Sequence, residues 1–331
     1  MRRQITYRIE KEEQTAGRPS SCAEFRRRRG FSRHLLTYLR HHEDTLLLNG
    51  VSVFTNHPLT KGDVLTVIFT DEIPSVGIIP NPMALTIVYE DEDILVINKP
   101  PYLPIQPSIG HYEYTLGNGV AAYYATQGIP FVYRCVNRLD RNTSGLVIIA
   151  KNMASSAILY EEMKERRIRR TYLTVVHGGI DSPGTIDAPI RRRTASMIER
   201  CVDPVSGQRA VTHYVPLSRN PDNDTTALRV RLETGRTHQI RVHMAYIGHP
   251  VVGDTLYGSE ASAEGLRREA QGTPPVPVPP AALHSDSLIG RQALHSLQLE
   301  FMHPITRQML SFEAPVPDDI RSLLRADTGS S

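Results

Sequence analysis

Residues 136–145 read VNRLDRNTSG and lead directly into an apolar run at 146–150. The segment places one carboxylate, that of Asp140, between two arginines on a turn that enters a strand. A short acidic side chain that is fixed by a rigid element and surrounded by positive charge stays ionised, which suits a nucleophile or a base. Because Asp, Asn, Thr, Ser and Gly also favour turns for local reasons, an Asx-type turn that ends at Gly145 is the structural alternative.

Three further stretches accompany this segment: ILVINKP at 94–100, RTYL at 170–173 and GRTHQIRVH at 235–243. Together the four stretches resemble the signatures of the RluA-type RNA pseudouridine synthases, whose catalytic motif is usually written H-R-L-D-x-x-T-S-G. The segment differs from this motif at the first position, where Asn137 replaces the histidine of the family. Four matches in the expected order, from about residue 85 to about residue 318, leave little room for coincidence.

Composition sets the broad class of the protein. The chain has 331 residues, of which 40% are hydrophobic and 22% charged, as in an ordinary globular protein with one large core and a smaller module. No apolar run is long enough to cross a bilayer and no signal-peptide core follows Met1, so we expect a cytoplasmic protein without a membrane partner. The three cysteines, Cys22, Cys135 and Cys201, are far apart, which predicts reduced thiols and no zinc site.

The net charge of +3 says little about nucleic acid, but the basic residues are clustered. Clusters at 26–29, 164–170 and 191–193 can neutralise phosphates and predict salt-dependent RNA binding, although a solvated charged face has the same pattern. The predicted RNA-binding residues are Arg26, Arg27, Arg28, Arg29, Lys99, Arg169, Arg170 and Arg236.

Composition shifts along the chain predict its domain organisation. Residues 1–20 are polar and predict a flexible N-terminus, with a short strand at 4–9 as the alternative. Residues 21–72 place a serine-capped helix, a strand-turn-strand pattern and a K-G-D turn in an order that resembles the small S4 RNA-binding module. Residues 73–83 have the proline content of a linker, and residues 84–325 are expected to form the catalytic domain.

Strand patterns outnumber helical patterns in the expected catalytic domain. Strands are predicted at 86–98, 145–150, 171–176, 211–217, 227–232, 293–301 and 308–314, and helices at 153–167 and after Thr237. A stretch dominated by proline and alanine, 272–282, is expected to loop out. The pattern predicts an α+β fold with a largely antiparallel, mixed sheet and flanking helices. The resemblance implies the pseudouridine synthase catalytic fold with a central RNA-binding cleft, preceded by a small α/β S4-like domain.

The resemblance assigns the chemistry to Asp140. In pseudouridine formation the bond from ribose C1′ to uracil N1 breaks, the base turns, and C1′ joins C5. The family uses one aspartate at this motif position, and an ionised carboxylate can attack C1′ or take a ribose proton. This chemistry implies no cofactor and no metal. The chain also contains no phosphate-binding loop, no dinucleotide fingerprint and no H-E-x-x-H motif.

Arg241 lies near the start of a helix that is predicted between Thr237, as its N-cap, and Gly248. A cation gains nothing from the helix dipole at that end, so the position indicates a specific anion. The resemblance implies that this anion is the Asp140 carboxylate, and an RNA phosphate is the alternative.

Four more residues are assigned to the site by the resemblance. Tyr172 is expected to stack on the target base, and Arg138 to fill the space or bind the phosphate that a flipped-out uridine leaves behind. Leu146 and Leu256 are expected to line the uracil pocket. Ordinary core packing also accounts for Tyr172 and for both leucines, and a structural ion pair also accounts for Arg138.

We therefore predict an RNA pseudouridine synthase that acts as a monomer on structured RNA, above all on large-subunit ribosomal RNA. Transfer RNA is the alternative target within the same family. A non-catalytic RNA-binding or ribosome-assembly factor is the alternative outside it, but such a factor has no need to keep Asp140, Tyr172 and Arg241 together. A glycoside hydrolase is disfavoured, because no paired carboxylate motif supplies its second acid.

Overall fold

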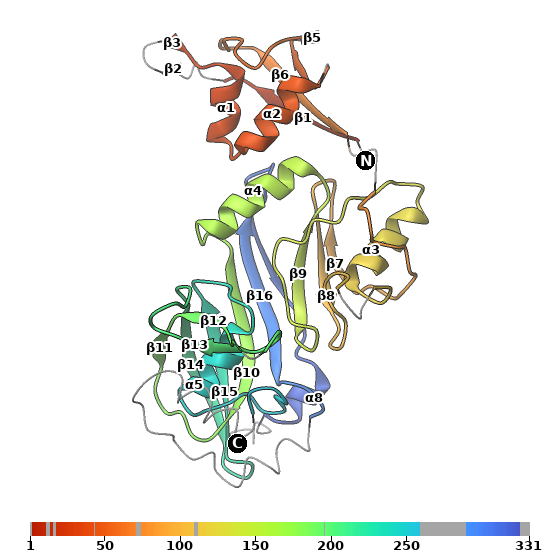
Figure 1. Cartoon of the computed structure of the whole chain (residues 1–331). Helices are drawn as coiled ribbons and strands as arrows, with labels where there is room; N and C mark the ends of the chain where they lie inside the picture. The colour runs from red at the N-terminus through yellow and green to blue at the C-terminus, as the bar shows by residue number, and fades with distance from the viewer. Residues whose placement is uncertain are drawn as a thin grey trace, which may run out of the picture.

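The chain forms two units, an N-terminal unit on a four-stranded sheet and a main domain on a nine-stranded sheet (Figure 1). The computed structural model describes residues 2–10, 14–15, 18–42, 44–70, 74–108, 112–194, 196–258 and 289–324. The stretch 272–282, which is expected to loop out, lies outside the described residues. Within the described part of the chain, no helix is both long and apolar enough to cross a membrane.

The N-terminal unit places two helices on a sheet of strand order β1-β6-β4-β5. Its strands are β1 (Arg2–Arg8), β2 (Gln14–Thr15), β3 (Arg18–Pro19), β4 (Leu46–Leu48), β5 (Val51–Ser52) and β6 (Val64–Thr70), and its helices are α1 (Cys22–Arg28) and α2 (Arg33–His41). Both helices begin at serine caps, because the hydroxyls of Ser21 and Ser32 accept hydrogen bonds from backbone N–H groups three residues later. The predicted serine-capped helix corresponds to α2, which follows Ser32 and precedes the strand-turn-strand pattern of β4 and β5.

The expectation of a flexible N-terminus is wrong for residues 2–8. These residues form β1, which pairs antiparallel with β6 from Arg2 opposite Thr70 to Arg8 opposite Val64. Ile5 is buried between two exposed neighbours, which is the alternation of a strand with one face over a core. The residues on the outward face of β1 are polar, and this polar composition alone resembles that of a flexible terminus.

The main sheet is largely antiparallel and contains one parallel pair. Its order is β11-β14-β15-β10-β16-β9-β8-β7, with β17 also paired to β16, and β16 runs parallel to β9. The strands are β7 (Ile87–Glu90), β8 (Ile94–Lys99), β9 (Ser144–Ala150), β10 (Arg169–His177), β11 (Gly184–Asp187), β14 (Val211–Asn220), β15 (Thr225–Leu232), β16 (Leu294–Met302) and β17 (Met309–Glu313), with β12 (Ile190–Arg192) and β13 (Arg200–Val202) in a separate two-stranded sheet. The predicted α+β class with a mixed, largely antiparallel sheet is confirmed.

The described helices of the main domain are α3 (Leu116–Ala125), α4 (Met153–Lys164), α5 (Gln239–Tyr246) and α8 (Asp318–Arg321). Helix α3 is not predicted by its sequence pattern, because Gly117 and Gly119 weaken helical propensity. It forms because Thr115 and Asn118 cap its first turn reciprocally. Gly119 also admits Met83, whose Sδ would lie 2.6 Å from a Cβ at position 119.

Residues 74–83, expected as part of a linker, run along α3. The N–H of Asn81 donates to the carbonyl oxygen of Asn118 at 3.1 Å, and Nδ2 of Asn118 donates to the carbonyl oxygen of Ile79 at 2.8 Å. Three prolines in this stretch restrict its backbone, and these hydrogen bonds hold it against the main domain.

Helix α4 joins the two units (Figure 1). Ala154 and Ile158 pack into the hydrophobic core of the N-terminal unit, whereas Leu159 packs into the main domain against the face of the sheet that carries Ile94 and Ile148. The N-terminal unit is therefore docked on the helix that also borders the site described below.

Two long-range pairings bring the candidate site segments together. The loop 136–143 enters β9, where Ser144 and Gly145 lie opposite the start of β16. Gly145 has a φ of +109°, and a Cβ there would lie 2.2 Å from the backbone oxygen of Ser296, so the turn into β9 requires glycine. Strand β15 pairs with β10 and leads through residues 233–238 into α5. The 136–143 loop and the start of α5 consequently line one cavity beside β10.

Candidate active site

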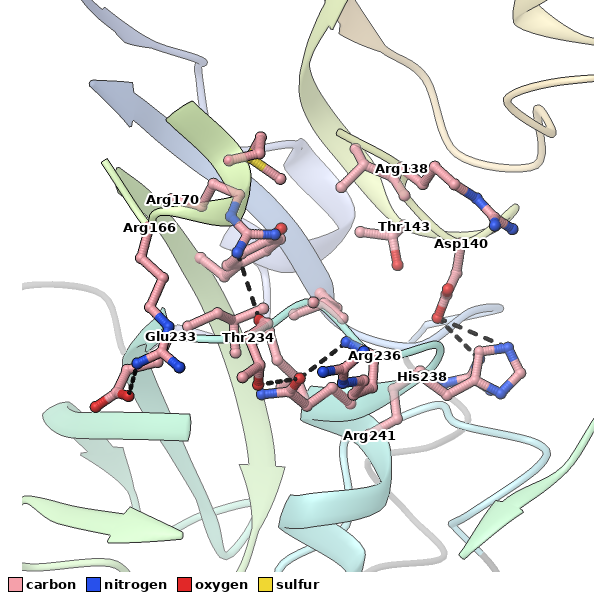
Figure 2. A pocket seen from close by; sticks show the side chains of 18 of the residues that line it. Arg138, Asp140, Thr143, Arg166, Arg170, Glu233, Thr234, Arg236, His238 and Arg241 are labelled. Atoms are coloured by element: carbon pink, nitrogen blue, oxygen red, sulfur yellow. Dashed lines mark hydrogen bonds and ion pairs between the residues drawn. The ribbon is translucent and has the colours of Figure 1, made fainter. Parts of the chain in front are cut away.

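A cavity of about 450 Å³ lies between the 136–143 loop, the C-terminal end of α4, the start of β10 and the start of α5 (Figure 2). Its charged lining residues are Arg138, Asp140, Lys164, Arg166, Arg170, Glu233, Arg236 and Arg241. Six cations thus surround two carboxylates. This excess of positive charge, together with the ring of Tyr172, suits a polyanion that carries a planar group.

Asp140 projects from the 136–143 loop into this cavity. Its side chain is 23% exposed, and Oδ2 accepts a hydrogen bond from Nη1 of Arg241 at 3.2 Å. Nε2 of His238 lies 4.0 Å from the same oxygen. Behind the carboxylate, the N–H of Thr143 donates to the carbonyl oxygen of Asp140 and closes the turn. The carboxylate is therefore held from one side while part of it still faces the cavity.

Arg241 is oriented by a second carboxylate, that of Asp254, whose side chain is 0% exposed. Nε and Nη2 of Arg241 donate to the two oxygens of Asp254 at 2.6 and 2.8 Å, and this fork leaves Nη1 directed at Asp140. Oδ1 of Asp254 also accepts the backbone N–H groups of Leu256 and Tyr257 at 3.0 and 3.1 Å. Burial lowers the pKa of Arg241, but the hydrogen bonds to Asp254 together with the charges of Asp254 and Asp140 raise the pKa above its ordinary value.

Helix α5 has His238 as its N-cap, so the predicted cap at Thr237 is wrong. His238 adopts a left-handed backbone conformation, with a φ of 58°, and makes no side-chain cap hydrogen bond. Its Nδ1 instead lies 2.8 Å from the hydroxyl of Tyr257, which places Nε2 beside Asp140. A left-handed conformation is costly for a residue other than glycine, and here it turns an imidazole toward the site. Burial lowers the pKa of His238, and the nearby Asp140 opposes this shift.

Asn137 ties the loop to β9. Its side chain is buried, Nδ2 donates to the carbonyl oxygen of Leu146 at 3.1 Å, and Oδ1 accepts the N–H of Ile148 at 2.7 Å. The amide thus uses both a donor and an acceptor to hold the segment that carries Asp140. Histidine, which the family signature has at this position, offers the same pair of functions.

Lys99 holds the 136–143 loop from inside the protein. The prediction that Lys99 contacts RNA is wrong. The residue is 0% exposed, and Nζ donates to the carbonyl oxygens of Pro100, Leu103 and Arg141 at 2.7, 2.9 and 3.1 Å. Burial lowers the pKa of Lys99 to about 7. A lysine whose donors are used by three carbonyls inside the protein has no path to a phosphate.

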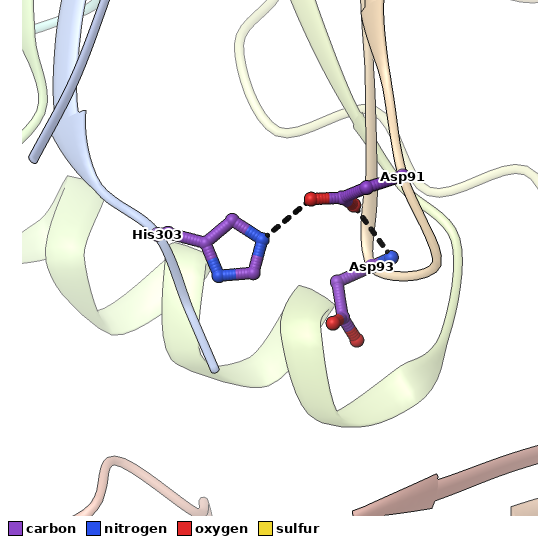
Figure 3. A group of neighbouring side chains, drawn as sticks. All are labelled: Asp91, Asp93 and His303. Carbon is purple, nitrogen blue, oxygen red and sulfur yellow. Dashed lines mark hydrogen bonds and ion pairs between the residues drawn. The ribbon is translucent and has the colours of Figure 1, made fainter. Parts of the chain in front are cut away.

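Residues with metal-binding side chains also gather outside the cavity, at Asp91, Asp93 and His303 (Figure 3). Nδ1 of His303 accepts two backbone N–H groups, at 305 and 306, so the ring proton lies on Nε2 and is donated to Asp91 at 2.9 Å. Nε and Nη2 of Arg3 donate to the two oxygens of Asp93 at 2.9 and 2.8 Å. The cluster is therefore saturated by hydrogen bonds within the protein, and it links β1 to the main domain.

Comparison with known proteins agrees with this arrangement. A profile of the RNA pseudouridylate synthase family matches residues 93–246, which include the 136–143 loop and Arg241. The uncharacterized RNA pseudouridine synthase YjbO of Bacillus subtilis is 42% identical over 299 residues, which cover 90% of this chain and 96% of that protein. The chain belongs to the RNA pseudouridine synthase family.

Other members of the family extend the likeness. Ribosomal large subunit pseudouridine synthase D of Xylella fastidiosa is 38% identical over 304 residues, 89% of this chain and 85% of that protein. Among solved structures, Human RNA Pseudouridylate Synthase Domain Containing 1 is similar with a TM-score of 0.52 and 27% identity, over 71% of this chain and 86% of that one. The resemblance to RluA-type enzymes is confirmed, and the protein is an RNA pseudouridine synthase.

Of the four further residues predicted for the site, Tyr172 and Arg138 line the cavity. Leu146 and Leu256 do not. Tyr172 lies in the cavity wall and is only 4% exposed, and Arg138 is exposed at its edge. Leu146 is fully buried in the core that packs against α4, and Leu256 packs against the main core. Strand β9 is buried on both faces, so its alternation does not reveal which side faces the cavity. Leu294 lines the cavity instead.

The arginines predicted to bind RNA differ in exposure. The prediction is wrong for Arg26, which is 0% exposed, donates from Nε to the carbonyl oxygen of Cys22, and has no surface from which to contact a phosphate. The guanidinium of Arg29 lies 3.4 Å from the ring centroid of Phe25 and is half-buried. Arg170 is buried in the cavity wall. Four of the predicted residues are exposed: Arg27, Arg28, Arg169 and Arg236.

Proposed function

We propose that this pseudouridine synthase isomerises specific uridines of ribosomal RNA, above all of the large subunit, with Asp140 as its catalytic group. The observation that carries the assignment of Asp140 is its position, 3.2 Å from Arg241 in a cavity lined by six cations. The choice of ribosomal RNA is supported by the relative from Xylella fastidiosa, which is named as a large-subunit enzyme.

The cavity accounts for the steps that this reaction needs. A uridine must leave its stack to reach Asp140, and we assign to Arg138, which is exposed on the same loop, the role of filling the space that the base vacates. Tyr172 presents an aromatic ring in the cavity wall against which a pyrimidine can lie. An ionised Asp140, paired with Arg241, then attacks C1′ or takes a ribose proton.

The reaction balances without a co-reactant. The C1′–N1 bond breaks, the C1′–C5 bond forms, N1 gains a proton and C5 loses one. Every atom of the product therefore comes from the substrate, apart from protons exchanged with the site or with water. The residues needed are a carboxylate and groups that hold the base and the backbone, and the presence of Asp140, Tyr172 and several arginines in the cavity lining supports the proposal.

We further propose that the protein works as a monomer in the cytoplasm. Cys22, Cys135 and Cys201, all within the described residues, form no disulfide, which fits a reducing compartment.

Mapping pseudouridines in a strain that lacks the protein tests the proposed function. We expect one or a few ribosomal RNA positions to remain uridine and to regain pseudouridine when the wild-type gene is restored. Expression of the Asp140→Asn variant is expected to leave them as uridine. Complete modification of ribosomal RNA in the deletion strain, with a missing pseudouridine in transfer RNA instead, would reassign the target class.

The N-terminal unit is proposed to contribute RNA affinity in the manner of the S4 module that it resembles. Arg27 and Arg28 are its exposed members of the predicted basic cluster. Deleting the whole unit would uncover Ala154 and Ile158 on α4, because both pack into its core. Substitution of the surface charges is therefore the cleaner experiment.

In the Arg27→Gln/Arg28→Gln variant, we expect weaker RNA binding with a shallower dependence on salt, the slope falling by about one for each phosphate that is no longer neutralised. The single-turnover rate at saturating protein is expected to stay unchanged, because the cavity lies in the main domain. Arg321→Gln is the matched control, since Arg321 is an exposed arginine on α8, at the other end of the molecule (Figure 1). An unchanged affinity and salt slope in the double variant would rule out RNA binding through this cluster.

A further inference from the structure

Arg170 is a buried cation in the wall of the cavity. It is the second residue of β10 and is 8% exposed, although one side of it borders the cavity. Nη2 makes a long hydrogen bond of 3.4 Å to the carbonyl oxygen of Thr234, and Nε is buried without any hydrogen-bond partner. The hydroxyl of Tyr172 also lies within hydrogen-bonding reach of Arg170. A guanidinium has five N–H donors, so several of them still have no acceptor within the protein.

The carboxylates of the cavity are engaged by other residues. Glu233 accepts from Arg166 at 2.9 Å, from Arg209 at 3.1 Å and from His213 at 3.0 Å. Asp140 is paired with Arg241. In the part of the chain that the structure describes, no carboxylate lies within ion-pair distance of Arg170.

The contrast with Arg241 shows what is missing. The two arginines are the buried cations of the cavity, and Arg241 is matched by the carboxylates of Asp254 and Asp140. A buried charge that lacks a partner is costly, and the cost falls when an anion arrives. Arg170 therefore lacks the anionic partner that Arg241 has, and a bound ligand can supply that anion.

Gly235 and Tyr172 border the guanidinium of Arg170. Gly235 has no side chain, and a Cβ at that position would lie 2.9 Å from Nη1. Tyr172 stands two residues further along the same strand. Burial raises the pKa of the Tyr172 hydroxyl, Arg170 opposes this shift and Asp140 adds to it, so both charges lie near the same ring.

We propose that Arg170 is the subsite for a phosphate of the nucleotide that is being isomerised. This inference rests on the proposed function and adds a second recognition point to it. The base lies against Tyr172, the ribose faces Asp140, and a phosphodiester on one side of the ribose pairs with Arg170. Recognition of the phosphate in the cavity that Asp140 also lines positions C1′ without any reading of the neighbouring bases.

Ligand-observed NMR titration of the full chain with uridine, uridine 5′-phosphate and uridine 3′-phosphate tests the subsite. We expect one of the two phosphates to improve the affinity over that of uridine by roughly tenfold or more, as for a hydrogen bond between charged groups. In Arg170→Gln this gain is expected to disappear, while the affinity for uridine itself changes little. The two phosphate arms identify which side of the ribose Arg170 contacts.

Two further variants control the result. Arg231→Gln removes an exposed arginine of β15 that lies opposite Thr171 of β10 but does not line the cavity, and it is expected to keep the full gain. Gly235→Ala keeps the charge but pushes on Nη1, and it is expected to reduce the gain.

A phosphate gain of equal size in Arg170→Gln and wild type overturns the subsite, and so does the absence of any gain in wild type. Failure of the proposed function has a different signature, because it appears as unchanged ribosomal RNA in the deletion strain. Circular dichroism and thermal unfolding of Arg170→Gln check that the fold is kept. If that variant does not fold, the response of Gly235→Ala decides the matter.

Discussion

Replacing Asp140 with asparagine is expected to abolish pseudouridine formation while leaving the fold and RNA binding nearly intact. The substitution keeps the size of the side chain and removes its charge. An amide neither attacks C1′ nor takes a proton at neutral pH, so the single-turnover rate should fall by roughly 10³-fold or more.

The fold should tolerate this change for a structural reason. The Asp140 side chain is 23% exposed and contacts Arg241 through one hydrogen bond of 3.2 Å, whereas Arg241 keeps both of its bonds to Asp254. The substitution therefore leaves Arg241 with a carboxylate partner. We therefore expect the free energy of unfolding to change by less than about 1 kcal/mol.

The measurement is a single-turnover assay at saturating protein on the RNA that mapping identifies, together with thermal unfolding. Asp222→Asn makes the same chemical change on an exposed turn outside the cavity and should match wild type. Turnover of Asp140→Asn within tenfold of wild type would remove Asp140 from the centre of the mechanism.

The sequence predicts strands well where both faces of the strand are apolar and less well elsewhere. The run 145–150 corresponds closely to β9, because every residue of that strand is buried. The prediction 211–217 stops short of the observed end of β14 at Asn220, because the last part of that strand is largely exposed and carries polar residues. The pairing between β1 and β6 depends on contacts more than fifty residues apart, which no local pattern contains.

Charged residues show a second limit of the sequence. Arg26 and Lys99 look like surface cations in the sequence, yet both are fully buried. Lys99 is tolerated inside because three carbonyl oxygens converge on its Nζ, two from the turn at 100–103 and one from Arg141, and that convergence exists only in the folded chain. Local charge clustering therefore predicts the charge of a segment but not the environment of each side chain.

Asp254 marks the boundary between what could and could not be predicted at the site. The position of Arg241 at the start of a helix indicates an anionic partner, and Asp140 is indeed within hydrogen-bond distance. The same reasoning cannot reveal a second partner, because Asp254 lies in a loop after α5 with no capping, periodic or motif pattern around it. Its role depends on the fork geometry that only the folded structure provides.

The Asp254→Asn variant is expected to lower the single-turnover rate by roughly 100-fold and to destabilise the protein by about 3–5 kcal/mol. The carboxylate is fully buried and supplies both acceptors for Nε and Nη2 of Arg241. An amide offers one acceptor and presents N–H groups to a guanidinium, so Arg241 loses its fixed direction. Arg241 then has Asp140 as its remaining carboxylate partner, and it no longer holds Asp140 in a fixed position.

A double-mutant cycle separates this positioning role from general destabilisation. If Asp254 acts through Arg241, then Arg241→Met/Asp254→Asn should turn over no more slowly than Arg241→Met alone. The double variant should also regain part of the stability lost in Asp254→Asn, because the guanidinium of Arg241 is no longer buried without its main partner.

Glu162→Gln serves as the matched control for the loss of a buried carboxylate. Glu162 accepts from Arg167 at 2.6 Å and from Arg307 at 3.4 Å, its side chain is 6% exposed, and it does not line the cavity. We expect this variant to lose stability while its rate at saturating protein, measured below the unfolding transition, stays within about twofold of wild type. If Asp254 acts only through Arg241, then replacing Asp254 has no further effect on the rate once Arg241 is gone. Additive rate losses in the cycle would show that Asp254 affects catalysis by another route.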